Sequence, residues 1–319
     1  MALHDPPPPR ALDIGPEARE RSVMNPTEEA DRLAESAGAR LLSDVVVSAV
    51  GEDAREWLHG QLTVDLRERS EAVRYALLLE VKGKIVGDLW VVDRGPIDGG
   101  DEERFDLLLP GTHADAMLER LERFLVMEDV ELERLPVRVL SIQGPAAAAV
   151  LPDGVEALAI DRLGHGGREL LVAADGAEAQ LAALDVPAIS EAGWELARLR
   201  AARPRVGLDF GERTLPQEAG LKKRALAFDQ GCYVGQEPVV MLEHRGKPPK
   251  RLVQLTFESA PAPAIGDAVL AGDRPAGTIT SAAADGEGAV AIALVKRKLL
   301  EGDAPLLVGA RAPTVAVVE

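Results

Sequence analysis

The sequence has little of several residue types that particular functions require. Its 319 residues contain one cysteine, so it has no internal disulfide and cannot by itself supply the four thiolates of an iron–sulfur cluster or of a structural zinc site. Aromatic residues make up only 3%, which leaves little for stacking on single-stranded bases. No apolar run approaches the roughly 20 residues that cross a bilayer, and no secretory signal is visible. We therefore expect a cytoplasmic protein with no membrane contact.

Charge and motif content exclude further classes. The net charge is −17 and the pI is near 4.8, which argues against general nucleic-acid binding because phosphate neutralisation needs a basic surface. The spaced motifs of P-loop, Rossmann, serine hydrolase and paired-histidine metal sites are absent. A hydrophobic content of 46% is ample for real cores, and the length allows two or three domains.

Local patterns predict the order of elements along the chain. Asn25 followed by Pro26 and Glu28 is typical of a capped helix start. A turn at residues 82–84 joins two predicted strands into a hairpin that places Asp88 within a strand. Periodicity predicts strands over residues 45–50, 75–79, 85–92, 105–109 and 137–142, and helices over residues 53–59, 113–124, 194–200 and from Ala146 onward.

Composition divides the chain into three parts. The first 25 residues are rich in proline and charge and predict a disordered tail. Beyond residue 249, short β-rich stretches at 252–257, 268–271 and 289–294 are separated by proline and glycine turns, which favours a small C-terminal β-barrel. The predicted organisation is therefore a tail at 1–25, a main domain at 26–248 and a barrel at 249–319.

The densest chemistry lies in the stretch Asp-Gln-Gly-Cys-Tyr-Val-Gly-Gln-Glu at residues 229–237. Glycines on both sides of Cys232 permit positive φ and close approach, which presents a thiol rather than burying it. Gln236 and Glu237 add hydrogen-bonding groups beside it. On these residues alone a structural turn remains open, with Cys232 acting as a small hydrophobe.

This stretch resembles the K-G-C-Y-x-G-Q-E signature of the folate-binding YgfZ family, which is related to the aminomethyltransferase of the glycine cleavage system, the T-protein. Gln230 departs from it, standing where the family usually has lysine, and glutamine cannot favour the thiolate as an ammonium would. Residues 51–65 resemble the N-terminal G-x-D-A-x-x-F-L-x-x-Q-x-T-x-D of the superfamily, and residues 277–282 resemble the G-x-V-T-S of its last domain.

The resemblance implies a fold and a cofactor. The expected fold is α+β, a T-protein-like domain of antiparallel sheets with flanking helices, in two related halves that divide near residue 136, followed by the barrel. The expected cofactor is tetrahydrofolate, with Tyr233, Gln236 and Glu237 of the cysteine loop among its contacts. Asp88 lies near the place of an aspartate that acts on the folate nitrogen, although Gly87 replaces the neighbouring aspartate; a hydrogen-bonded strand aspartate is the alternative.

Three more residues follow from the resemblance. Arg200, four positions before Pro204, falls on the arginine of a family segment that reads L-R and then P, and it suits the glutamyl carboxylates of folate, with a structural salt bridge to Asp209 or a nearby glutamate as the equal alternative. Glu218 either accepts hydrogen bonds from the pterin or caps a turn. Glu169 falls near the position of the glutamate that grips the pterin, in a segment shorter than in aminomethyltransferases and lacking their tyrosine.

Three functions are compatible with these residues. The first is a tetrahydrofolate-binding accessory protein that acts on iron–sulfur assembly or client proteins, is linked to tRNA modification, and uses Cys232 as its functional thiol. The second is a folate-dependent one-carbon transferase in which Asp88 assists. The third is a folate-free scaffold, for which Gln230 is evidence. We expect no metal site formed by the chain alone.

Overall fold

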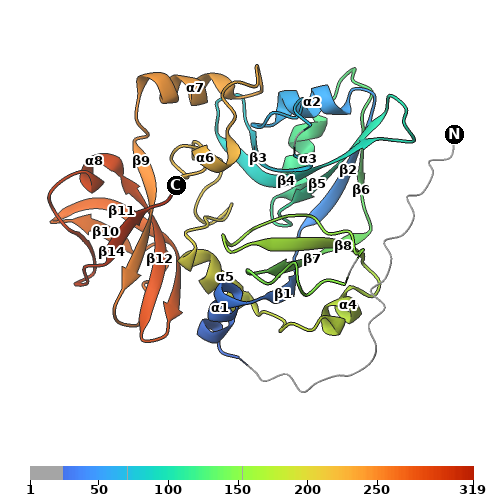
Figure 1. Cartoon of the computed structure of the whole chain (residues 1–319). Coiled ribbons are helices and arrows are strands. Elements are labelled where there is room, and N and C mark those ends of the chain that lie inside the picture. The colour runs from blue at the N-terminus through green and yellow to red at the C-terminus, as the bar shows by residue number, and fades with distance from the viewer. Residues whose placement is uncertain (1–23, 70, 153) are drawn as a thin grey trace.

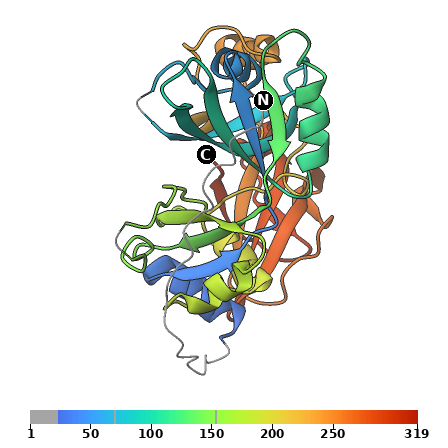
Figure 2. The same cartoon turned by 90° about the vertical axis from the view of Figure 1, so that its right-hand side faces the viewer.

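The computed structural model describes residues 24–69, 71–152 and 154–319. Residues 1–23 of the predicted tail lie outside the described residues. Three lobes are visible in Figure 1, and the view turned by 90° in Figure 2 shows the five-stranded and three-stranded sheets one above the other in front of the C-terminal sheet.

The strands of these described ranges form three sheets whose pairings are all antiparallel. The five-stranded sheet has the order β3 (Val73–Leu79), β4 (Ile85–Pro96), β5 (Glu103–Leu109), β2 (Val45–Gly51), β6 (Glu131–Arg134). The three-stranded sheet has the order β1 (Gly38–Leu41), β7 (Val137–Gln143), β8 (Gly167–Ala173). The C-terminal sheet has the order β13 (Leu306–Val308), β10 (Ala268–Ala271), β11 (Arg274–Asp285), β12 (Gly288–Lys296), β9 (Lys250–Phe257), β14 (Thr314–Val317).

Helices flank the sheets or link them. They are α1 (Pro26–Glu35), α2 (Ala54–Gln61), α3 (Ala114–Glu122), α4 (Ala177–Ala183), α5 (Glu191–Arg200), α6 (Lys222–Ala225), α7 (Gln236–Arg245) and α8 (Arg297–Leu300). No helix within the described ranges is long and apolar enough to cross a membrane.

The start of α1 shows how local sequence fixes an element. The side chain of Asn25 accepts hydrogen bonds from the backbone N–H groups of Thr27 and Glu28, both at 3.0 Å. The Glu28 carboxylate accepts in return from the N–H of Asn25 at 2.9 Å. Such a box satisfies donors that helix geometry leaves unpaired and stabilises a helix by about 1 kcal/mol. The predicted cap is confirmed.

The register of the β3–β4 hairpin decides which residues share a face. Tyr75 pairs with Trp90, and Leu77 pairs with Asp88. Because side chains alternate along a strand, these four residues point to the same side of the sheet. The opposite side packs against α2 and α3 in one hydrophobic core. The first side faces a second core, which takes residues from α1, α5, β9 and β12 and so joins the five-stranded sheet to the C-terminal sheet.

The α+β class with a curled C-terminal sheet is confirmed, and one expected element is wrong. Residues 145–150 form successive turns, not the predicted alanine-rich helix. The N–H groups of Ala147 and Ala149 bond to carbonyls three residues back. Pro145 and Pro152 leave too few residues between them for a cooperative helix, whatever the propensity of alanine.

Candidate functional site

The cysteine loop is held by the segment that carries the second sequence motif. The N–H of Val234 donates to the carbonyl of Gly60 at 3.0 Å. The side-chain amide of Gln230 donates to the carbonyl of Leu62 at 2.9 Å, and Nε2 of His59 donates to the carbonyl of Gln230 at 2.9 Å. Two stretches about 170 residues apart therefore form one structural unit.

Close backbone approach explains the second glycine of the loop. Gly235 has φ of +84° and precedes α7. A Cβ atom there would lie 2.4 Å from the carbonyl oxygen of Glu80 in the β3–β4 turn. The side chain of Gln236 donates to the carbonyl of Gly231 at 2.7 Å and closes the loop. Cys232 is exposed at its tip.

Of the residues around Cys232 in the loop, some are buried in the core and others are exposed to solvent. Tyr233 is 6% exposed and packs in the central core. Its hydroxyl has no hydrogen-bond partner, and burial raises its pKa to about 12. Gln230, at the position of the family lysine, is 4% exposed. Glu237 is exposed in the first turn of α7. The loop thus offers the thiol and Glu237 to the outside and uses Tyr233 and Gln230 as anchors.

Asp88 on β4 has a buried carboxylate oxygen without a hydrogen-bond partner, as a ligand-binding carboxylate would. The hydroxyl of Tyr75 donates to Oδ2 of Asp88 at 2.7 Å. The other oxygen, Oδ1, is buried and has no partner. Burial raises the pKa of the Asp88 carboxyl, and the hydrogen bond from Tyr75 opposes that rise. A carboxyl with one held oxygen and one free oxygen can accept a hydrogen bond or exchange a proton.

Aromatic and cationic groups surround this pair. The rings of Tyr75 and Trp90 have centroids 5.1 Å apart. The guanidinium carbon of Arg224 lies 4.7 Å from the centroid of the Tyr75 ring. Burial, followed by the negative charge of Asp88, raises the pKa of Tyr75 well above its usual value. Tyr75 therefore stays a neutral hydrogen-bond donor at physiological pH.

Glu169 is part of a buried ion cluster. It is 0% exposed and accepts hydrogen bonds from Ser141 at 2.9 Å and from two nitrogens of Arg162. Arg162 also contacts Asp44 at 2.7 Å. Burial alone would lower the pKa of Arg162, but the charges of Asp44 and Glu169 raise it. Both oxygens of Glu169 are therefore engaged within the protein.

Arg200 and Glu218 are also engaged. Arg200 binds Asp285 on β11 and Asp31 on α1, so its salt bridges are to these residues. Asp209, the expected partner, instead pairs with Arg198 at 2.7 Å. Glu218 accepts from the N–H of Leu215 at 2.9 Å and lies 3.6 Å from the Lys84 ammonium. Its carboxylate caps a turn.

Thr63 ties α6, the helix that carries Arg224, to strand β3. Its hydroxyl donates to the carbonyl of Ala225, at the end of α6, and accepts from the N–H of Leu77 on β3. Sequence reasoning did not single out Thr63, His59 or Tyr75. A signal existed for each: the first two lie within the motif at 51–65, and the hairpin register puts Tyr75 beside Asp88.

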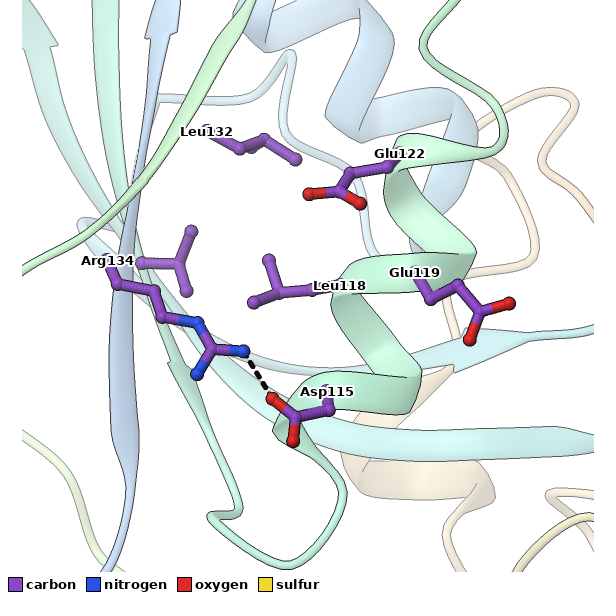
Figure 3. A pocket seen from close by; sticks show the side chains of 7 residues that line it. Asp115, Leu118, Glu119, Glu122, Leu132 and Arg134 are labelled. Atoms are coloured by element: carbon purple, nitrogen blue, oxygen red, sulfur yellow. Dashed lines mark hydrogen bonds and ion pairs between the residues drawn. The ribbon is translucent and has the colours of Figure 1, made fainter.

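A cavity of about 400 Å³ lies where α1, α5 and the turn at 163–165 meet, and its lining residues include Arg200, Arg203 and His165. A second cavity, of about 200 Å³, lies between α3 and β6 (Figure 3), where Arg134 pairs with Asp115. No cluster of three or more histidine, cysteine or acidic side chains suited to a metal ion is found among the described residues.

Comparison with known proteins agrees with the motifs. Residues 250–319 match the family model for the CAF17 C-terminal beta-barrel domain. The tRNA-modifying protein YgfZ of Vibrio atlanticus is 24% identical over 211 residues, 63% of each chain. The mitochondrial iron–sulfur cluster assembly factor IBA57 homolog of Pyricularia oryzae is 24% identical over 225 residues, 67% of this chain and 55% of that one.

A solved structure gives the fold. The aminomethyltransferase T of the glycine cleavage system from Bartonella henselae superposes with a TM-score of 0.77 at 22% identity, covering 92% of this chain and 88% of that one. The sequence matches to YgfZ and IBA57 proteins, together with this fold, confirm the resemblance to YgfZ-type proteins. The chain spans 63% of the length of the Vibrio relative and 55% of the length of the Pyricularia relative. The activities of those whole proteins are therefore only proposed for this chain.

Proposed function

We propose that this protein binds a reduced folate beside Asp88 and acts in iron–sulfur cluster assembly or repair, with a link to tRNA modification, through the thiol of Cys232. The observation that carries the folate part is the buried and unpartnered Oδ1 of Asp88. An unsatisfied buried acceptor costs about 1–3 kcal/mol. An N–H donor on a ligand would remove that cost.

The residues around Asp88 fit tetrahydrofolate through this oxygen and through two aromatic rings. The reduced pterin has N–H groups to donate to Oδ1, and the Tyr75 and Trp90 rings provide apolar faces beside it. Glu169, Glu218 and Arg200 are already bonded to protein groups, so each would have to exchange a partner to contact the cofactor. When bound, tetrahydrofolate supplies a carrier for one-carbon units.

The protein's own part in that chemistry is positioning and proton exchange. Tyr75 fixes the Asp88 carboxyl by holding Oδ2. Burial raises the pKa of this carboxyl towards neutral pH. The carboxyl is therefore suited to take up and return a proton at Oδ1. The neighbouring Gly87 carries no second carboxylate.

The thiol supports the assembly role. Cys232 is exposed on a loop that three hydrogen bonds tie to the body of the protein and a fourth closes on itself. A single cysteine cannot complete a cluster, so the remaining ligands of an iron–sulfur cargo would come from a partner or from small molecules. The relatives whose names include tRNA modification and iron–sulfur assembly support this role.

Calorimetric titration with tetrahydrofolate under reducing conditions tests the cofactor. The unmodified protein should bind, and Asp88→Asn should weaken binding about 10- to 100-fold, the range for losing a hydrogen bond to a charged group. Asp273→Asn, an exposed barrel aspartate, is the matched control and should bind normally. Absence of binding by the unmodified protein would refute the folate proposal and favour a folate-free scaffold.

Cys232→Ser separates the assembly role from the second candidate, a one-carbon transferase, which Asp88 favours. In cells that lack the protein, the unmodified chain should restore cluster-dependent enzymes and Cys232→Ser should not, while the purified variant still binds folate. Full restoration by Cys232→Ser would contradict the thiol role and support the transferase.

A further inference from the structure

Two arginines close to the Asp88 site have no carboxylate partner. Arg203, just after α5, and Arg224, in α6, make no ion pair with any residue that the structure describes. The chain has 53 acidic residues against 36 lysines and arginines, so acids are plentiful. Nε of Arg203 is buried and has no hydrogen-bond partner.

The charges around this pair leave it a net cationic site. Burial, and then the charge of Arg224, lower the pKa of Arg203, so the two guanidinium groups repel each other. Asp161 is the carboxylate that opposes this effect on Arg203. Its Oδ1 already accepts hydrogen bonds from the N–H groups of Leu163 and Gly164 at 3.1 and 2.6 Å. A bound anion would relieve the repulsion that Asp161 does not cancel.

Arg203 lies beside a cavity, and Arg224 lies beside the Asp88 site. Arg203 lines the cavity of about 400 Å³ that it shares with His165. A Cβ atom on Gly164, at φ of +84°, would lie 3.1 Å from Nη2 of Arg203, so the turn approaches the guanidinium closely. Arg224 stacks on the ring of Tyr75, whose hydroxyl holds Asp88.

We propose that Arg203 and Arg224 form an oxyanion site that takes the carboxylates of the glutamyl tail of the reduced folate held at Asp88. A guanidinium binds a carboxylate or a phosphate through two parallel hydrogen bonds, which is the chemistry that both unpaired side chains retain. This inference rests on the proposed folate function and assigns the tail to residues other than Arg200, which is occupied by Asp31 and Asp285. It makes the glutamate content of the folate a determinant of affinity.

The experiment compares ligands that differ only in the tail. Tetrahydropteroate, tetrahydrofolate with one glutamate and tetrahydrofolate with three glutamates are titrated calorimetrically into the full-length protein, into Arg203→Gln, Arg224→Gln and the double variant. Arg274→Gln, an exposed arginine of the barrel, is the control for loss of one positive charge. Inorganic phosphate alone is titrated as a source of the same oxyanion chemistry without a pterin.

The unmodified protein should bind the glutamylated ligands at least about tenfold more tightly than tetrahydropteroate, as expected for one charge-assisted bidentate contact. The double variant should bind all three equally, and Arg274→Gln should behave as the unmodified protein. Arg203→Lys keeps the charge without the fork and should retain part of the preference.

Three results would overturn the inference, each in a recognisable way. Equal binding of all three ligands by the unmodified protein leaves the folate site standing and removes the tail site; this comparison requires no variant to fold. Binding of phosphate that depends on both arginines, without binding of any pterin, means an oxyanion site unrelated to folate. No binding of any ligand refutes the proposed function together with the inference.

Discussion

Replacing Arg162 with methionine should destabilise the protein in a pH-dependent manner, because it leaves buried carboxylates without their cation. The side chain of Arg162 is 18% exposed, and those of Glu169 and Asp44 are 0% and 10% exposed. Breaking a buried ion pair from one side costs about 3–5 kcal/mol. The variant can limit this cost by protonating Glu169, the more deeply buried of the two carboxylates.

The size of the effect follows from that protonation. Burial already raises the pKa of Glu169 above its ordinary 4.5, and Arg162 opposes the rise, so the substitution raises it further. Holding Glu169 neutral at pH 7 costs about 1.4 kcal/mol for each of about 2.5 pH units above 4.5, or about 3.5 kcal/mol. At pH 5.5 the same cost is about 1.4 kcal/mol. Asp44 adds to the loss at both pH values.

The sign follows from linkage. In the variant the folded-state pKa of Glu169 lies above its unfolded value, so the neutral side chain favours folding most below pH 4.5, and this contribution is lost as pH rises through the folded-state pKa. The loss of stability relative to the unmodified protein should therefore be greater at pH 7 than at pH 5.5.

Urea denaturation followed by tryptophan fluorescence at the two pH values measures this difference. Arg138→Met is the matched control, because its pair with Glu178 is 3.8 Å long and the two side chains are 40% and 78% exposed. Exposed pairs contribute less than about 1 kcal/mol. A loss for Arg162→Met no larger than that of Arg138→Met, or equal at both pH values, would refute the reasoning.

Three further predictions concern the loop and two glycines. Tyr233→Phe should leave stability unchanged or raise it by up to about 1 kcal/mol in urea denaturation, because it removes a buried hydroxyl without a partner; a clear loss would mean that the hydroxyl is satisfied. Gly51→Ala should lower the free energy of unfolding by more than about 3 kcal/mol in thermal or urea denaturation, because its Cβ would lie 1.8 Å from the carbonyl oxygen of Asp129. Gly60→Ala, in open space within α2, should raise the free energy of unfolding by up to about 1 kcal/mol. Similar effects of the two substitutions would contradict this steric argument. Cys232 should react with a chromogenic disulfide without denaturant and give one thiol per chain, because it is exposed; a need for denaturant would show that the loop covers it.

Much of the secondary structure could be predicted because its causes are local. The capping box at Asn25, the turn at Gly83 and the strand at 268–271 depend on residues within a few positions of one another. The alanine-rich segment after Gly144 failed as a helix for an equally local reason, the prolines that bound it. The domain boundaries and the roles of the candidate site residues stay predictions.

The side-chain partners of the candidate site could not be predicted in the same way. Arg200 meets Asp285 and Asp31 across 85 and 169 residues of sequence. His59 meets the carbonyl of Gln230 across 171 residues. Such contacts depend on how the lobes pack, and periodicity within an element carries no information about that.

The sequence by itself determined that Cys232 lies in a glycine-flanked loop, that Asp88 lies within a strand and that the chain has an antiparallel α+β fold, because turn chemistry, alternation and motif residues are encoded locally. Only the tertiary structure decided which polar groups remain unpaired. Packing of the lobes gave Arg200, Glu169 and Glu218 partners within the protein. It left Oδ1 of Asp88 and Nε of Arg203 buried without any, and burial without a partner is a property of the assembled core rather than of any segment.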